Sequence, residues 1–305
     1  TLRIELAKLQ DAMGDASAAI ETLRSVLEEN RGRTDAVVAL SDLLEKGGKD
    51  EELAELLAGQ IEAAKERSDA AAELALQVRL GEVYETRLKD AGKALATFEA
   101  VLERDETHHG ALEAVARLAE GRSIWDRAAS ALERLVAGES EPSSGVALAL
   151  RLANAKDKLA DTAGVESALG AALRFESGNV EVRDRLRALY EKNQQWSELA
   201  AFLAEDATLL EAQGDGAHAA MVKLLRRAAD IHVKQRSVPG DAVTVLERAA
   251  KLAPNDRELL LALCDAYTAA GREKDAADVL ERIIASFGGK RSKELALYHH
   301  RLGRV

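Results

Sequence analysis

One set of apolar positions recurs along the chain at an almost constant spacing, and this repetition limits the possible folds more than any other feature. Each set starts with a small residue, with one arginine as the exception: Ala7, Ser41, Gly81, Ala116, Ala153, Arg187, Ala229 and Cys264. Twelve or thirteen residues later come Ala19, Leu53, Ala94, Ala128, Val165, Leu199, Ala242 and Ala276. Four residues further lie Leu23, Leu57, Phe98, Leu132, Leu169, Leu203, Leu246 and Leu280. The chain is therefore expected to be a repeat protein rather than two ordinary globular domains.

The composition indicates that each repeat is built from helices. Apolar residues make up 47% of the chain but aromatic residues only 3%, and the apolar share is mostly Ala and Leu, which favour helices. Residues three or four apart share one face of a helix, which matches the spacing inside each set. No stretch alternates Val, Ile and Thr with polar residues between turn signals, as a strand would require. The sequence predicts an all-α fold.

The clearest repeat contains Leu80-Gly81-Glu82-Val83-Tyr84, followed by Ala94 and Phe98. It resembles the tetratricopeptide repeat, which has Leu-Gly-x-x-Tyr on a first helix and Ala-x-x-x-Phe on a second. The resemblance implies a right-handed superhelical solenoid of about eight helical hairpins. It also implies that first helices line a concave face on which protein partners bind.

The expected repeats cover about 1–33, 34–67, 73–108, 109–142, 146–179, 180–213, 220–254 and 257–290. We expect a single solenoid domain over residues 1–290. Alternate repeats are more alike, so the repeats form doublets, in a style similar to long multi-repeat proteins of GC-rich bacteria. Residues 291–305 echo the start of the third repeat and are expected to begin a truncated ninth, so we expect the chain to be a piece of a longer solenoid.

Several positions depart from the family pattern. The usual Trp of the first helix is replaced by Val37, Gln77, Leu112, Arg183 or Leu260. Gln60 and Asp206 lie at a normally apolar position of second helices, which suggests looser packing in repeats two and six. Trp125 and Trp196 start second helices in alternate repeats. They are expected to pack against the next repeat, and a binding role for them is the alternative.

The charge balance excludes several classes of partner. The chain has 42 basic and 53 acidic residues, a formal net charge of -11, which repels nucleic acid and anionic membrane surfaces. No apolar run approaches the roughly 18 residues that would span a bilayer. Cys264 is the single cysteine, which fits a reducing compartment and weakly favours the cytoplasm. We therefore expect no nucleic-acid partner and no membrane insertion of this segment.

The sequence contains no motif that would support catalysis. There is no phosphate-binding loop, no His-Glu-x-x-His, no nucleophile elbow and no calcium loop. The adjacent pairs His108-His109 and His299-His300 point in different directions on a helix, which disfavours metal chelation. Cys264 occupies the small-residue position and is expected to be a buried thiol rather than a nucleophile. We expect no enzyme activity, no cofactor, no metal and no small-molecule substrate.

Partner-facing residues should lie on first helices, opposite the apolar stripe. Helical spacing selects the candidates Arg79, Glu82, Arg117, Arg151, Asn154, Arg185, Lys223, Arg226, Arg227 and Asp230. Four cations and one acid on the first helix of repeat seven form a local positive patch in an acidic chain, and Arg side chains suit carboxylates. The carboxylate clamp of chaperone-binding relatives is not matched, because only Asn154 falls on a clamp-like position.

Three functional hypotheses follow. The leading one is a protein-interaction scaffold or adaptor whose concave groove holds a peptide or helix of a partner, acidic where it meets repeat seven. The second is an architectural spacer rod in a large assembly. The third is a regulatory region of an enzyme whose catalytic domain lies outside this segment.

Overall fold

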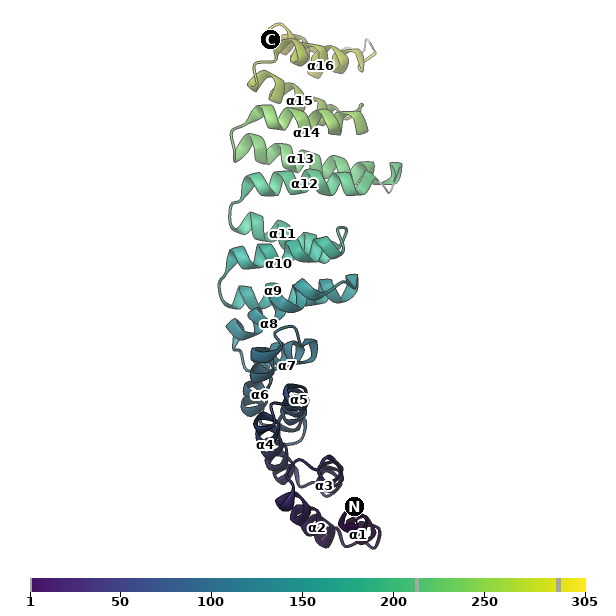
Figure 1. The fold of residues 1–305 in the computed structure, drawn as a ribbon. Helices are drawn as coiled ribbons and strands as arrows, with labels where there is room; N and C mark the ends of the chain where they lie inside the picture. The colour runs from purple at the N-terminus through teal and green to yellow at the C-terminus, as the bar shows by residue number, and fades with distance from the viewer. Residues whose placement is uncertain (1, 212–213, 289–291) are drawn as a thin grey trace. The chain divides into compact units, whose positions relative to one another are not determined.

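The computed structural model describes residues 2–211, 214–288 and 292–305. Over these ranges it contains seventeen α-helices, one short 3-10 helix and no strand, which confirms the all-α prediction (Figure 1). The chain forms two compact units, residues 1–176 and 177–305. Within each unit every helix packs against the next one along the chain, as in a tetratricopeptide solenoid. The division into eight repeats and the ninth start remains a prediction.

The helices of the first unit are α1 (Leu2–Ala12), α2 (Ala16–Glu29), α3 (Thr34–Lys46), α4 (Asp50–Glu66), α5 (Ala70–Thr86), α6 (Ala91–Arg104), α7 (His109–Gly121), α8 (Trp125–Gly138), α9 (Pro142–Lys158) and α10 (Thr162–Phe175). Those of the second unit are α11 (Val180–Lys192), α12 (Trp196–Glu211), η1 (Asp215–Ala217), α13 (His218–Lys234), α14 (Pro239–Leu252), α15 (Arg257–Ala269), α16 (Glu273–Ala285) and α17 (Lys293–Leu302). The first helices of the predicted repeats are therefore the odd-numbered ones and the second helices the even-numbered ones.

Each turn from a first helix to a second helix contains one residue with a left-handed backbone. These residues have φ between 54° and 86°: Gly14, Gly48, Lys89, Ser123, Ala160, Gln194, Ser237 and Gly271. Only three of them are glycines, although the left-handed region costs other residues about 1 kcal/mol. After several of these turns an aspartate caps the N-terminus of the second helix. Asp90, for example, accepts hydrogen bonds from the backbone N–H groups of Gly92 and Lys93 at the start of α6. The turns thus fold the chain into tight helical hairpins.

The core lies between successive helices and follows the predicted positions. Of the small residues of first helices, Ala7, Ser41, Ala116 and Cys264 are at most 1% exposed. The Leu or Phe that recurs on every second helix, from Leu23 to Leu280, is at most 3% exposed. Burial raises the pKa of the Cys264 thiol, which disfavours the reactive thiolate. Trp196 packs against a cluster that includes Leu199 and Leu203, as the packing hypothesis expects. In the described ranges, no helix combines the length and the apolar character needed to cross a membrane.

Candidate partner-binding groove

Three of the predicted partner-facing arginines lie in the first unit, and each forms ion pairs with the first helix of the preceding repeat. The pairs are Arg79 with Glu45 (Nη2–Oε1, 2.9 Å), Arg117 with Glu85, and Arg151 with Glu113 (Nη1–Oε2, 3.2 Å) and Glu120 (Nη2–Oε2, 2.9 Å). Glu82 and Asn154 are exposed on α5 and α9. The arginines of this unit therefore connect successive repeats along the first-helix face.

The second unit uses the same kind of contact around α13. Arg227 pairs with Glu191 of α11 (Nη2–Oε2, 2.8 Å), and Arg226 pairs with Glu258 of α15 (Nη2–Oε2, 3.2 Å). Asp230 pairs with Lys234 on its own helix (Oδ1–Nζ, 3.2 Å). Arg185 is half-buried on α11.

Lys223 differs from these residues, because it is exposed and forms no ion pair with the described part of the chain. It is therefore the candidate cation that is most available to a ligand.

An open groove of about 650 Å³ runs along the N-terminal half of α13. Its lining includes four of the predicted residues, Lys223, Arg226, Arg227 and Asp230, with Val222 and Asp256. Leu252 and Ala253, from the end of α14, close its other side. The structure thus brings the positive patch predicted for repeat seven into one groove, whereas Arg79, Glu82, Arg117, Arg151 and Asn154 lie in the other unit.

A second cavity, of about 390 Å³, continues from this groove between α13 and α15. It shares Arg226 and Asp230 with the first, and Val233, Leu246 and Ala266 give it an apolar lining. Val233 is 44% exposed, so it contributes apolar surface to this cavity. The two cavities place cations beside an apolar depression, an arrangement suited to a segment that carries both a carboxylate and an apolar side chain.

Helical spacing explains why α13 can present this surface. Met221, Leu225 and Ala228 are at most 1% exposed and face the core of the unit. Lys223, Arg226, Arg227 and Asp230 fall on the opposite side of the same helix, because successive residues are about 100° apart. The buried face therefore orients the charged face.

His232 lies near the C-terminal end of α13, where it is 8% exposed. Its Nδ1 atom is 2.7 Å from Nη1 of Arg236. Burial, followed by the positive charge of Arg236, lowers the pKa of His232 below its ordinary value of 6.5, although Asp241 opposes the shift. The lowered pKa favours the neutral imidazole in the folded chain.

This shift predicts that the chain loses stability as the pH falls. Because the unfolded state binds the His232 proton more readily, the stabilisation is complete above pH 6.5 and is lost as the pH falls through the lowered folded pKa. Denaturant unfolding at pH 7.5 and pH 5 should show a smaller pH dependence for His232→Gln than for the parent. An equal pH dependence in the two proteins would contradict this assignment.

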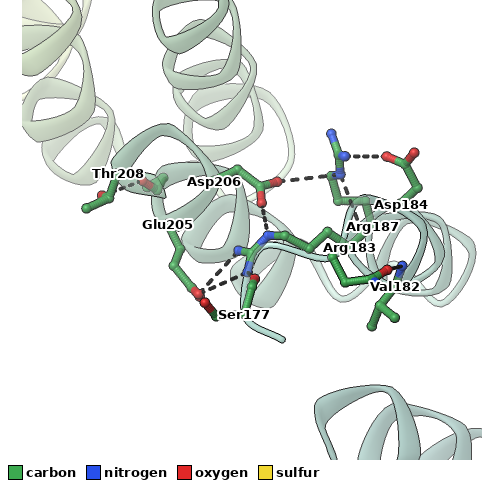
Figure 2. A network of polar contacts seen from close by, with 10 residues as sticks. Ser177, Val182, Arg183, Asp184, Arg187, Glu205, Asp206 and Thr208 are labelled. Carbon is green, nitrogen blue, oxygen red and sulfur yellow. Dashed lines mark hydrogen bonds and ion pairs between the residues drawn. The ribbon is translucent and has the colours of Figure 1, made fainter. Parts of the chain in front are cut away.

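A buried network in repeat six was missed by the sequence analysis, although three of its members stood out as exceptions there. Arg183 and Asp206 are 4% and 7% exposed and form an ion pair between α11 and α12 (Figure 2). Arg187 Nε lies 3.5 Å from Asp206 Oδ2, and Arg183 Nη2 lies 3.2 Å from Glu205 Oε1. Arg183 Nη1 also donates to the carbonyl of Ser177. Asp206 therefore marks a specific charged contact in repeat six. The expected looser packing is also present, because α11 and α12, like α3 and α4, pack against each other less extensively than the helices of the other hairpins.

The described residues contain no group of three or more His, Cys, Asp or Glu side chains that could hold a metal ion. The His108 side chain accepts a hydrogen bond from the backbone N–H of Ala111 and so caps α7.

Residues 239–295, which span α14 to the beginning of α17, match the family model of the tetratricopeptide repeat. This segment of the chain has the sequence of the tetratricopeptide repeat family. Repeats of this family generally bind proteins, and their scaffold is usually non-catalytic. Among curated proteins, no sequence matches that of this chain.

Several solved structures are similar to this chain at low identity. A structure of Naa15/Naa10 bound to HypK-THB is 14% identical, with a TM-score of 0.46, over 96% of this chain and 42% of that one. YrrB, described as a TPR protein with an unusual peptide-binding site, is 16% identical, with a TM-score of 0.34, over 66% and 95%. The C-terminal part of a TPR repeat-containing protein from Cytophaga hutchinsonii is 12% identical, with a TM-score of 0.38, over 85% and 99%. The chain thus spans less than half the length of the first of these.

Proposed function

We propose that this chain is a protein-interaction scaffold that holds an acidic segment of a partner protein in the groove along α13. The observation that carries the proposal is the groove of about 650 Å³ in which Lys223, Arg226 and Arg227 surround an apolar wall. The whole chain has a net charge of -11, so a cluster of three cations on one helix is a local exception. An acidic ligand is therefore attracted to this groove more than to the rest of the surface.

The contacts of the three cations support a carboxylate ligand. Lys223 is exposed without an ion-pair partner in the described ranges, so it binds a ligand carboxylate without breaking a contact. The side chains of Arg226 and Arg227 are 37% and 47% exposed, and their pairs with Glu258 and Glu191 are surface contacts. Surface pairs contribute only about 0–1 kcal/mol each, so a ligand carboxylate can replace Glu258 or Glu191 at little cost. The neighbouring apolar cavity accommodates one apolar side chain of the ligand.

The double variant Arg226→Glu with Arg227→Glu tests the proposal. We expect the fold to persist, because neither residue is in the core, and the affinity for an acidic partner peptide to fall at least tenfold at low salt. Pull-down with the parent chain identifies the partner, and fluorescence anisotropy measures the affinity of both proteins across a salt series. The control is Lys251→Glu with Arg282→Glu, which makes the same charge change on the exposed faces of α14 and α16. Equal binding by the parent and the groove variant would contradict the proposal.

One observation favours the alternative of an architectural rod for the first unit. Arg79, Arg117 and Arg151 connect successive first helices, so this face of the unit stabilises the stack of repeats. A rod requires repeat-to-repeat contacts more than a free groove. Two results together would favour the rod. Pull-down would repeatedly fail to recover any peptide, and charge reversal at Arg117 would lower the melting temperature. A regulatory role beside a catalytic domain outside this segment requires the full gene sequence to test.

A further inference from the structure

A second groove lies on the opposite, second-helix side of the first unit. Helices α2 and α4 form its walls, and Leu40 and Leu44 of α3 form part of its floor. Its volume is about 650 Å³, as large as that of the groove on α13. Arg24 of α2 and Glu52, near the N-terminal end of α4, form an ion pair that crosses the groove. Beyond this bridge the groove is open.

The groove contains a buried polar side chain that the fold does not use. Gln60 of α4 is 8% exposed, lines the groove, and forms no hydrogen bond with the described part of the chain. The corresponding residues of the other second helices are buried and, except for Asp206, apolar, such as Val26, Val101 and Leu135. Neither polar atom of this amide is completely enclosed by the protein, so the amide faces the groove, where a ligand can hydrogen-bond to it.

The neighbouring glycine keeps the groove open. Gly59 precedes Gln60, and a Cβ atom added there would meet nothing within 4 Å. The residue of α8 at the position equivalent to Gly59 is Arg134. Its side chain forms an ion pair with Glu106, which follows the C-terminal end of α6, the preceding second helix (Nη2–Oε2, 3.4 Å). In α14 the equivalent residue is Arg248, which pairs with Glu211 of α12. Gly59 lacks the side chain that crosses between second helices at these other places.

The rim of the groove carries more acidic than basic side chains, and two of its glutamates, Glu52 and Glu62, already form ion pairs. Glu28, Glu52, Glu55 and Glu62 line it together with Arg24 and Arg31. Glu28 and Glu55 are exposed and have no ion-pair partner in the ranges that the structure describes. An apolar floor beneath an acidic rim is complementary to a helix with one apolar face and flanking lysines or arginines.

We propose that the α2–α4 groove is a second binding surface, which takes a basic amphipathic helix of a partner protein. The apolar face of that helix lies mainly on the half-buried Leu56, above the buried Leu40 and Leu44. Its cations face Glu28 and Glu55, and a polar side chain hydrogen-bonds to Gln60. This surface is separate from the α13 groove and takes a ligand of opposite charge.

The probe is a fluorescein-labelled amphipathic helical peptide with leucines on one face and lysines on its flanks, compared with a peptide in which glutamates replace the lysines. Anisotropy at low salt should show at least tenfold tighter binding of the lysine peptide to the parent chain. Gly59→Leu fills the groove and should weaken this binding at least tenfold. Gly170→Leu on α10, where an added Cβ also meets nothing within 4 Å, is the matched control and should bind as the parent does.

Two further measurements make the test specific to this surface. Glu28→Lys with Glu55→Lys should reverse the preference between the two peptides, while Arg226→Glu with Arg227→Glu should leave binding of the lysine peptide unweakened. Circular dichroism checks that each variant is folded. Equal affinity of Gly59→Leu and the parent would overturn the proposal. So would self-association of the parent in sedimentation that Gly59→Leu abolishes, because the occupant would then be a second copy of the chain.

Discussion

The variant Asp206→Leu is expected to lower the free energy of unfolding by about 3 kcal/mol or more. Removing this carboxylate leaves the buried guanidinium of Arg183 without its closest anion, and breaking a buried pair from one side typically costs about 3–5 kcal/mol. Glu205 remains near Arg183 Nη2 but its side chain is 58% exposed, so it compensates only in part. Denaturant unfolding measures the loss, and hydrogen exchange should place it in α11 and α12 (Figure 2).

A double variant separates the loss of the pair from the loss of packing. Arg183→Met with Asp206→Leu removes both charges and keeps apolar volume between α11 and α12, so most of the stability should return. The guanidinium of Arg183 lies 4.2 Å from the centre of the Phe202 ring, a position that a methionine side chain can also occupy. If the double variant is as unstable as Asp206→Leu, the charged pair is not the cause of the loss.

The variant Gly81→Leu should lower the free energy of unfolding by about 1–3 kcal/mol through overpacking, even though leucine favours a helix more than glycine does. A Cβ atom at Gly81 would lie 2.8 Å from the ring of Phe98, which is itself 3% exposed and has no space to move into. Thermal or denaturant unfolding checks the result. A gain in stability would contradict the close approach of α5 and α6.

A second variant tests whether the contact between Gly81 and Phe98 causes the loss of stability. Phe98→Leu shortens the opposing side chain, so Gly81→Ala should be tolerated better in that background than in the parent. Gly170→Ala, at a position of α10 with nothing within 4 Å of the added Cβ, should raise stability by up to about 1 kcal/mol. A glycine with space and a glycine without it should thus respond in opposite directions.

Local sequence predicts the left-handed residue of only some of the hairpin turns. Gly14, Gly48 and Gly271 are glycines at left-handed positions, so the sequence marks these turns directly. Lys89, Ser123 and Ala160 adopt the same backbone without such a signal. Their conformation is imposed by closing one helix onto the next, because the packing of the hairpin outweighs a local cost of about 1 kcal/mol.

The candidate surfaces depended on information that no single helix contains. Helical spacing was enough to place Arg79, Arg117 and Arg151 on the first-helix face, but not to show that they pair with glutamates of the preceding repeat. Such partners are more than 30 residues away in sequence, and the register between stacked helices decides which side chains meet. That these residues contact a protein partner stays a prediction.

The sequence by itself determined the helices, their order and their buried faces, because the apolar period and the small residues act within one or two helical turns. It also marked Gln60 and Asp206 as the same exception, a polar residue at an apolar position. Only the tertiary structure separated them. Asp206 meets Arg183 from the neighbouring helix and is neutralised, whereas Gln60 lies beside Gly59 in an open groove without a partner among the described residues. The cost of burying a polar group depends on what the neighbouring helix places opposite it, and that is decided by packing.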